Sequence, residues 1–430
     1  MIFILDYLEH IRGFLFAFLL FYPLFMAYLW MIGAIYYYWR RERGRPDHTQ
    51  EPPLPRYPGV SLVVPCHNEG DNVHETIAAL LAQTYPHFEI IAVNDGSRDN
   101  TGALLDELAE KHPQLRVLHF ARNQGKAMGL RMAALVSPHE FLVCIDGDAL
   151  LDPHATSWIM SHFVSGARVG AVTGNPRIRT RSTLLGKLQV GEFSAIIGMI
   201  KRAQRIYGRI FTVSGVVSGF RKTALHQVGY WSLDMVTEDI DISWKMQLNH
   251  WDIRYEPNAL CWILMPETLR GLWKQRLRWA QGGYEVLLRN TLGLFSWKRR
   301  RMWPVYLEFT TSVVWSYSML GVAVLWSLGF FFPLPDYLEI PSMIPEWPGV
   351  ILGLTCLLQF AVSLRIDSRY EKGLSRYYYW MIWYPLAFWL ISLLTSIVGL
   401  PKALFKKRGR RATWVSPDRG VTQGGAGGSR

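Results

Sequence analysis

Two aspartates separated by one glycine, Asp146 and Asp148, end the apolar run FLVCID. Carboxylate oxygens are the ligands that hard divalent cations prefer in proteins. A diphosphate brings its own anionic oxygens, so two aspartates beside it make chemical sense only with a bridging cation. Asp-Gly-Asp is also typical of a plain turn after a strand. The pair therefore indicates either a metal-assisted diphosphate site or a simple turn.

A third carboxylate, Asp239, lies in the sequence TED at the start of a helical pattern. Thr237 is predicted to be the N-cap, and Ile240, Trp244 and Leu248 share one helical face. In the first turn the helix dipole favours a charged carboxylate. Ordinary helix-start chemistry explains these residues as well as catalysis does. A general base acting on a hydroxyl would need desolvation to raise its pKa against the dipole.

Residues 269–288 form a basic amphipathic pattern in which Gln275, Arg278 and Trp279 share one helical face. The guanidinium of Arg278 offers a fork of donors suited to a diphosphate. Trp279 offers a flat apolar surface suited to a sugar ring. A helix lying in the membrane interface would explain the amphipathic pattern, but it would not explain this spacing.

These groups need a scaffold that brings them together, and residues 60–146 predict one. Strand-like runs at 60–65, 88–94, 115–120 and 141–146 alternate with helical stretches at 72–83, 101–111 and 126–136. Such alternation predicts a parallel sheet covered by helices on both faces, with ligands bound beyond the carboxyl ends of its strands. Those ends carry the polar residues His67, Asn68, Glu69, Asn94, Asp95, Ser97, Arg122, Asn123, Lys126, Asp146 and Asp148.

Several common site types do not fit the sequence. No GxxxxGK[ST] loop occurs and no GxGxxG follows the first strand, which disfavours P-loop and dinucleotide sites. The four cysteines lie far apart without a CxxC pair, so neither a zinc site nor a disulfide framework is supported. Buried, reduced cysteines suit a cytosolic domain.

The net charge of +12 comes from three short basic runs, at residues 40–45, 298–301 and 406–411. A nucleic-acid-binding protein would spread its basic residues over a folded face, so we expect no nucleic-acid partner. Each run abuts an uncharged stretch long enough to cross a bilayer. These stretches are residues 13–39, 309–335 and 377–401, and residues 347–364 form a fourth, marginal one.

The basic runs also predict an orientation. The first stretch lacks a small-residue cleavage site, so we expect a membrane anchor rather than a signal peptide. Because Lys and Arg gather on the cytoplasmic side of spans, residues 40–300 are predicted to face the cytoplasm. Three crossings after residue 301 would put the basic tail outside, against the same rule. Either residues 347–364 do not cross or the tail escapes the rule, and the sequence leaves both open.

In chain order, six motifs resemble those of the processive family 2 glycosyltransferases, which include cellulose, chitin, hyaluronan and poly-N-acetylglucosamine synthases. They are residues 67–69 (HNE), 94–97 (NDGS), 123–126 (NQGK), 146–148 (DGD), 237–239 (TED) and 275–279 (QRLRW). Residues 213–222, 237–248 and 412–420 are most similar to the bacterial poly-β-1,6-N-acetylglucosamine synthases of biofilm matrices. Only one predicted span precedes the catalytic region, where some relatives have two.

The resemblance implies an α/β fold of the GT-A type, with a Rossmann-like, mostly parallel sheet in a cytoplasmic domain, plus α-helical transmembrane segments. The predicted division is an anchor at 1–39, a basic, proline-rich linker at 40–59, a GT-A domain with interfacial helices at 60–300, a C-terminal membrane region at 301–404 and a basic tail, expected to be disordered, at 405–430.

It also implies a role for each matched residue. The predicted general base is Asp239, the ligand of a divalent cation (Mg²⁺ or Mn²⁺) is Asp148, and the acceptor sugar is held by Gln275 and Trp279. The residues predicted to bind the nucleotide donor are Glu69, Asp95, Lys126, Asp146 and Arg278.

The implied activity is inverting polymerisation of N-acetylglucosamine from UDP-GlcNAc, coupled to export of the polysaccharide. The resemblance places the enzyme in the bacterial inner membrane, where it would contact membrane lipid. Some relatives work with a small accessory membrane subunit and under cyclic-di-GMP control. A chitin- or hyaluronan-type synthase, a transferase that adds one sugar to a lipid carrier, a transporter and a membrane-anchored nucleotide sensor are the alternatives. The residues alone do not specify the donor sugar or the linkage.

Overall fold

The computed structural model describes residues 2–340, 347–407, 409 and 411–412 of the 430-residue chain. Within them, eight strands form one mixed sheet in the order β3-β2-β1-β4-β7-β6-β8-β5. The strands are β1 (Val60–Cys66), β2 (Phe88–Asp95), β3 (Leu115–Phe120), β4 (Phe141–Ile145), β5 (Leu150–Leu151), β6 (Val169–Ile178), β7 (Val217–Arg221) and β8 (Asp252–Ile263).

The first half of the sheet is parallel, as the alternating pattern predicts. Strand β1 lies between β2 and β4, with Val60 opposite Phe88 on one side and Phe141 on the other. All seven residues of β1 are buried, which explains its continuous apolar, β-branched run. The helices between these strands are α2 (Val73–Leu81), α3 (Thr101–Lys111) and α4 (Lys126–Val136). The carboxyl ends of the four strands consequently meet at one edge.

The second half of the sheet adds antiparallel pairs. Strand β7 runs antiparallel to both β4 and β6, and the short β5 runs antiparallel to β8. Helices α5 (Ala155–Ser165), α6 (Leu184–Phe193), α7 (Lys201–Tyr207), α8 (Lys222–Gln227), α9 (Glu238–Leu248) and α10 (Leu269–Leu294) occupy this half, with the π-helical segment η2 (Ser194–Ile200) joining α6 to α7.

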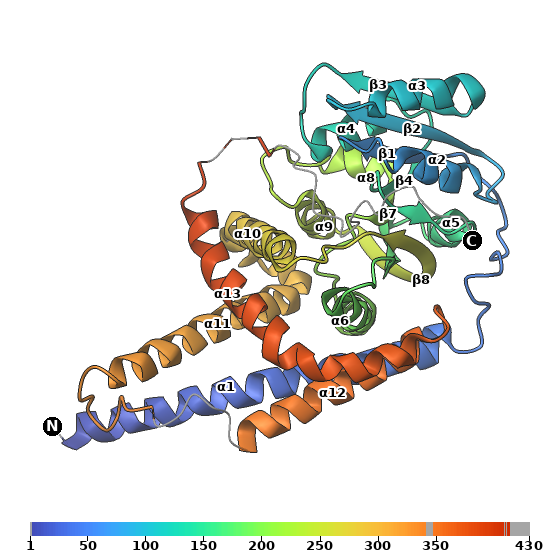
Figure 1. The fold of residues 1–430 in the computed structure, drawn as a ribbon. Helices are drawn as coiled ribbons and strands as arrows, with labels where there is room; N and C mark the ends of the chain where they lie inside the picture. Colours follow the sequence, from blue (N-terminus) through green and yellow to red (C-terminus); the bar gives the residue numbers. More distant parts are fainter. Residues whose placement is uncertain (1, 341–346, 408, 410, 413–430) are drawn as a thin grey trace, which may run out of the picture.

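In the described part of the chain, four helices are long and apolar enough to cross a membrane. They lie in the segments α1 (Ile2–Tyr37) with η1 (Tyr38–Glu42), η3 (Trp297–Met302) with α11 (Trp303–Gly329), α12 (Trp347–Asp367), and α13 (Tyr384–Leu404), which follows η4 (Leu374–Trp383). Helices α1, α11 and α12 project from the sheet domain on the same side, whereas α13 runs across them, next to α10 (Figure 1).

Both ends of α13 contact the sheet domain. At its start, the Tyr384 hydroxyl donates to Glu192 of α6 at 3.4 Å. Just past its end, Lys406 donates to Glu285 of α10 at 2.7 Å, and farther along Arg411 reaches Gln124. The described part of the basic tail therefore returns to the strand ends, while residues 413–430, which carry most of the 412–420 motif, lie outside the described residues.

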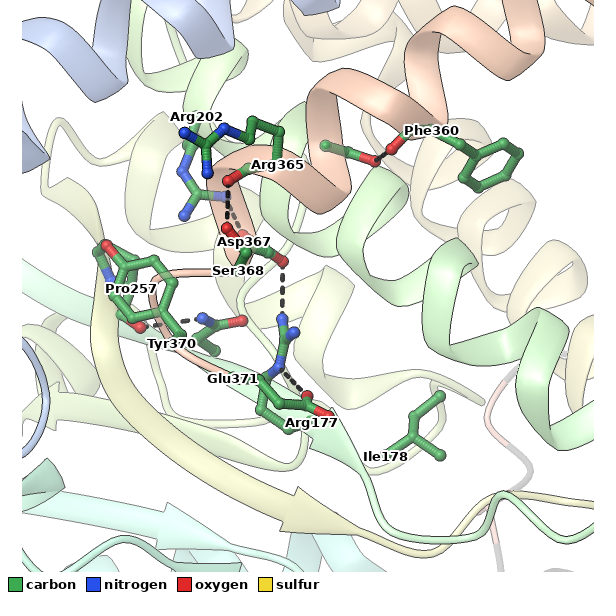
Figure 2. A network of polar contacts seen from close by, with 12 residues as sticks. Arg177, Ile178, Arg202, Pro257, Phe360, Arg365, Asp367, Ser368, Tyr370 and Glu371 are labelled. Carbon is green, nitrogen blue, oxygen red and sulfur yellow. Dashed lines mark hydrogen bonds and ion pairs between the residues drawn. The ribbon is translucent and has the colours of Figure 1, made fainter. Parts of the chain in front are cut away.

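A buried ionic network ties these spans to the sheet (Figure 2). Arg202 of α7 donates to Glu42 at 2.6 Å and to Asp367, the last residue of α12, at 2.8 Å. Arg177 of β6 donates to the other oxygen of Asp367 at 2.7 Å and to Glu371 at 3.2 Å. The helical segment expected to end at residue 39 continues as η1 to Glu42. The buried charge of Glu42 is neutralised by Arg202.

Candidate active site

The polar residues that follow β1, β2 and β4 lie together at the carboxyl edge of the sheet. Glu69 is buried, and its backbone N–H donates to the Thr101 hydroxyl at 2.7 Å. Gly147 packs against Glu69 so closely that an added Cβ would lie 3.0 Å from the Glu69 Cγ. The Asp-Gly-Asp turn after β4 and the loop after β1 therefore form one continuous floor.

Asp95, at the end of β2, organises the loop that precedes α4. Its carboxylate accepts hydrogen bonds from the N–H groups of Gln124, at 2.6 Å, and Gly125, at 2.8 Å. Burial raises the pKa of Asp95, although these two donors lower it in part. Asp95 thus fixes the backbone from which Lys126 extends. The predicted contact between Asp95 and a nucleotide stays a prediction.

Lys126 is the hub of the site. Its Nζ lies 2.5 Å from Asp146, 2.9 Å from the carbonyl oxygen of Gly215 and 3.3 Å from Glu238. Burial disfavours the ammonium charge, but Asp146 and Glu238 outweigh it, so the pKa of Lys126 lies above its usual value. The lysine therefore stays charged and joins the end of β4 to the start of α9.

Asp146 and Asp148 provide the carboxylates expected of a divalent cation site. Burial raises the pKa of Asp146, Lys126 lowers it, and the negative charge of Asp148 raises it again. Two carboxylates this close repel each other unless a cation lies between them. The described residues contain no group of three or more His, Cys, Asp or Glu side chains placed to hold a metal ion, so a cation here would need further oxygen ligands from a diphosphate. This donor set fits Mg²⁺ or Mn²⁺, which keep few protein ligands at phosphate sites.

Asp239 lies in the first turn of α9, as predicted. Burial, followed by the neighbouring Glu238, raises the pKa of Asp239 to about 6, while Lys126, the Ile240 N–H and Arg278 lower it. The desolvation that a general base requires at this position is therefore present. An added Cβ at Gly215 would lie 3.0 Å from the Asp239 carboxylate, so a side chain at position 215 would crowd the base.

Thr237 precedes α9 at the predicted N-cap position, but its hydroxyl does not cap the helix. That oxygen is buried and has no hydrogen-bond partner among the described residues. Thr237 packs instead against Gly282 of α10. The helix that carries Asp239 is therefore positioned by packing rather than by capping.

Helix α10 carries the predicted Gln275, Arg278 and Trp279. Arg278 is exposed and close enough to Asp239 to lower its pKa. Gln275 donates weakly to the sulfur of Met265 at 3.7 Å, and its side-chain oxygen is buried without a partner among the described residues. Trp279 is half-buried, with its ring centroid 6.4 Å from that of Phe193. The helix thus brings Arg278 to the base, while Trp279 borders α6.

Two buried cations in this region were not predicted from the sequence. Arg276 pairs with Glu192 and lies 4.3 Å above the Trp279 ring. Lys201 donates to the Thr173 hydroxyl at 2.8 Å, and burial lowers its pKa to about 7 despite the charge of Asp239. A lone carboxylate, Glu192, in the apolar segment 184–200 was the signal that a buried partner exists. No local signal marks Lys201.

Comparison with known proteins places these elements in a family. The profile described as "Glycosyltransferase like family 2" matches residues 58–282, more than half of the chain. The chain belongs to the family 2 glycosyltransferases. The match contains β1 to β8, α9 and the first half of α10, and therefore every predicted site residue. The predicted family and enzyme class are confirmed.

This family 2 glycosyltransferase has relatives of nearly the same length. It is 41% identical over 416 residues to the poly-beta-1,6-N-acetyl-D-glucosamine synthase of Staphylococcus epidermidis. The aligned region covers 95% of this chain and 99% of the relative. It is 41% identical over 413 residues to the synthase of the same name from Staphylococcus aureus (strain MSSA476), again over 95% of this chain and 99% of the relative.

A solved structure confirms the GT-A fold. The mannosyltransferase PcManGT from Pyrobaculum calidifontis, in complex with GDP-Man and Mn²⁺, superposes with a TM-score of 0.63 at 19% identity. The match covers 93% of this chain and 99% of that chain. The predicted, mostly parallel sheet domain is therefore confirmed, and the described residues also contain the expected helices that are long and apolar enough to span a membrane.

Proposed function

We propose that this glycosyltransferase polymerises N-acetylglucosamine from UDP-GlcNAc into a β-1,6-linked chain and moves the product outward for a biofilm matrix. The observation that carries the proposal is the identity to two synthases of this polymer over 95% of the chain. That identity extends beyond the family-wide core into the membrane helices, which a soluble one-sugar transferase would not need.

The proposed chemistry is a single displacement at the anomeric carbon. The Asp239 carboxylate accepts the proton of the acceptor hydroxyl, whose oxygen forms the new bond as the bond to UDP breaks. Because attack comes from the face opposite the leaving group, an α-linked donor gives a β-linked product. The raised pKa of Asp239, about 6, lets it accept this proton near neutral pH. Arg278, next to Asp239, would neutralise the diphosphate as it departs.

The donor site in this proposal consists of Glu69, Asp95, Lys126 and Asp146, with Asp148 as the cation ligand. A bound Mg²⁺ or Mn²⁺ would neutralise the diphosphate oxygens and make UDP a better leaving group. Lys126, which already pairs with Asp146, holds that carboxylate in place. Trp279, whose ring is fixed between Arg276 and Phe193, would stack on the acceptor sugar, while Gln275 lines the same face of α10.

For the membrane arrangement, we propose that α1, α11 and α12 cross the bilayer and that α13 lies along its cytoplasmic face. Asp367, at the end of α12, shares the ionic network of Glu42, at the end of α1. Helix α13 contacts the sheet domain near both of its ends, through Tyr384 and Lys406. Two crossings after residue 301 return the basic tail to the cytoplasm, so the charge rule is satisfied throughout.

The function is tested by incubating membranes that contain the protein with each labelled UDP-sugar. Polymer from UDP-GlcNAc that a β-1,6-specific glycosidase digests is the expected result. Asp239→Asn should abolish the polymer while UDP-GlcNAc still binds. Polymer sensitive only to chitinase or hyaluronidase, or a single sugar on a lipid carrier, would contradict the proposal. Co-purification and added cyclic-di-GMP would then test for an accessory subunit and for nucleotide control.

Topology needs a separate experiment. Reporters that are active only in the cytoplasm should work when fused after Arg430 and after Glu371. At a third position, after Ile340 between α11 and α12, the same reporter should be inactive, whereas a reporter that works only outside the cytoplasm should be active there. An external C-terminus would contradict the surface position of α13.

A further inference from the structure

Two adjoining cavities lie far from the transferase chemistry, at the opposite end of α9 from Asp239. The larger, of about 610 Å³, is lined by the turn after α9 and by the end of α10, including Asn249 and Leu292. The smaller, of about 350 Å³, is lined by Arg168, His250, Lys298, Arg300 and Arg301. His250 and Lys298 line both, so the two cavities form one hollow.

The hollow is strongly cationic and poorly compensated. Among the described residues that line the two cavities, none is acidic. Behind them, Asp252 is already shared by Arg205 at 2.9 Å, Arg254 at 3.1 Å and Arg209 at 3.8 Å. Burial, together with the positive charges of Arg301, Arg205 and Arg168, lowers the pKa of Arg209 even though Asp252 opposes this. Such repulsion indicates a place where an anion would be stabilised.

The hollow also adjoins the ends of two of the candidate spans. Arg301 is two residues before α11 begins at Trp303. On the neighbouring element, Tyr207 of α7, close to Arg205 and Arg209, packs against Gly33 of the spanning helix α1. Beside the basic groups, Leu292, Phe295 and Trp297 expose 89%, 72% and 67% of their surfaces. A large apolar surface next to cations suits a molecule with both an anionic head and an acyl tail.

We propose that this hollow binds the phosphate of an anionic phospholipid of the cytoplasmic leaflet. The headgroup lies among Arg168, Lys298 and Arg301, and the acyl chains run along Leu292, Phe295 and Trp297. Helix α10 carries Arg278 and Trp279 in its first half and forms a wall of the hollow at its other end. A bound lipid therefore holds the helix that brings these residues to the transferase site. The proposal does not depend on which sugar polymer is made.

The test compares two full-length variants of equal charge change. Lys298→Gln/Arg301→Gln removes two exposed cations of the hollow, and neither side chain hydrogen-bonds to another described residue. Arg41→Gln/Arg43→Gln removes two exposed cations just after α1, outside the hollow. Each protein is purified in neutral detergent, and its affinity for fluorescent phosphatidylglycerol and for phosphatidylcholine is measured. Native mass spectrometry counts the lipids retained.

We expect the wild type and the Arg41/Arg43 variant to prefer phosphatidylglycerol. The Lys298/Arg301 variant should bind it about 25-fold more weakly, since each basic residue near an anionic lipid contributes about fivefold. Equal weakening in both variants would show diffuse surface charge and overturn the proposal, as would equal affinity for both lipids. Competition by inorganic phosphate or glycerol phosphate at the concentration of the lipid would assign the hollow to a soluble ligand and also overturn it. Unfolding temperatures in neutral nanodiscs should match among the three proteins, which separates lipid binding from folding.

Discussion

Gly282 of α10 lies directly against Thr237, and a Cβ at position 282 would overlap the threonine side chain. Thr237 is the residue before α9, two positions from Asp239. The helix that carries Arg278 and the helix that carries the proposed base therefore meet at a point that admits no methyl group. Their relative position, and with it the distance between the base and the diphosphate-binding arginine, depends on that contact.

Gly282→Ala is accordingly expected to lower turnover by about 10- to 100-fold, since a displacement of about 1 Å at a reacting group has effects of this size. Overpacking should also cost about 1–3 kcal/mol of stability. Gly321→Ala in α11 is the matched control, because nothing lies within 4 Å of a Cβ there. Initial rates and unfolding temperatures in nanodiscs check both. Equal rates for the two variants would contradict the proposed dependence.

The pH dependence of turnover should report Asp239. Because burial and Glu238 raise its pKa to about 6, the base is protonated below that pH, and turnover should fall about tenfold per unit as the pH decreases further. Glu238→Gln removes one of the raising charges and should move this acid limb to lower pH. Glu110→Gln, an exposed change on α3, should leave it in place. If the midpoint of the acid limb is the same in Glu238→Gln as in the wild type, Asp239 is not the titrating base.

The metal dependence of polymer synthesis should change when Asp148, the proposed cation ligand, is replaced. Chelation is expected to abolish polymer synthesis in the wild type, and added Mn²⁺ or Mg²⁺ to restore it. In Asp148→Asn, half-maximal activity should need at least about tenfold more metal, because removing even a residue that only hydrogen-bonds to a metal ligand lowers metal affinity by about this factor. Asp106→Asn, which changes an exposed carboxylate paired with His119, serves as the control. The ligand assignment fails if the metal titrations of the wild type and Asp148→Asn coincide.

The ionic network should dominate the stability of the junction between spans and sheet. Asp367→Asn removes the charge shared by Arg177 and Arg202, and breaking a buried pair in this way costs about 3–5 kcal/mol. Asp336→Asn, an exposed change between the predicted spans, should cost nothing measurable. Thermal unfolding in nanodiscs compares the two. If Asp367→Asn and Asp336→Asn unfold at the same temperature, the network orients its side chains but does not stabilise the junction.

The parts of the fold that depend on local patterning were predictable. The helices at 101–111 and 126–136 and the strand at 115–120 have the predicted bounds, because apolar periodicity and strand-helix alternation are local properties. The antiparallel β7 was not predicted, because its place between β4 and β6 depends on pairing between distant segments. The position of α13 has the same explanation: its composition is that of a span, whereas its contacts with α6 and α10 are long-range.

For the site, strand order brought the predicted carboxylates together, since the ends of parallel strands share one edge. The sequence did not predict that both oxygens of Asp95 accept backbone hydrogen bonds, or that Arg276, rather than only its motif neighbours, is buried against Trp279. Such contacts depend on which face of an element meets its neighbour, and a motif does not specify that. Lys201 was missed because a lysine in an amphipathic stretch is indistinguishable by sequence from a surface residue.

The network of Glu42, Arg177, Arg202, Asp367 and Glu371 also constrains how the protein is made. The arginines emerge from the ribosome with the sheet, but two of their carboxylate partners follow much later, Asp367 at the end of α12 and Glu371 just after it. Until Asp367 and Glu371 have been made, β6 and α7 cannot bury those arginines without leaving a charge uncompensated. Completion of the catalytic domain is therefore coupled to synthesis of the chain's later half, so a chain that stops before Asp367 would not fold fully.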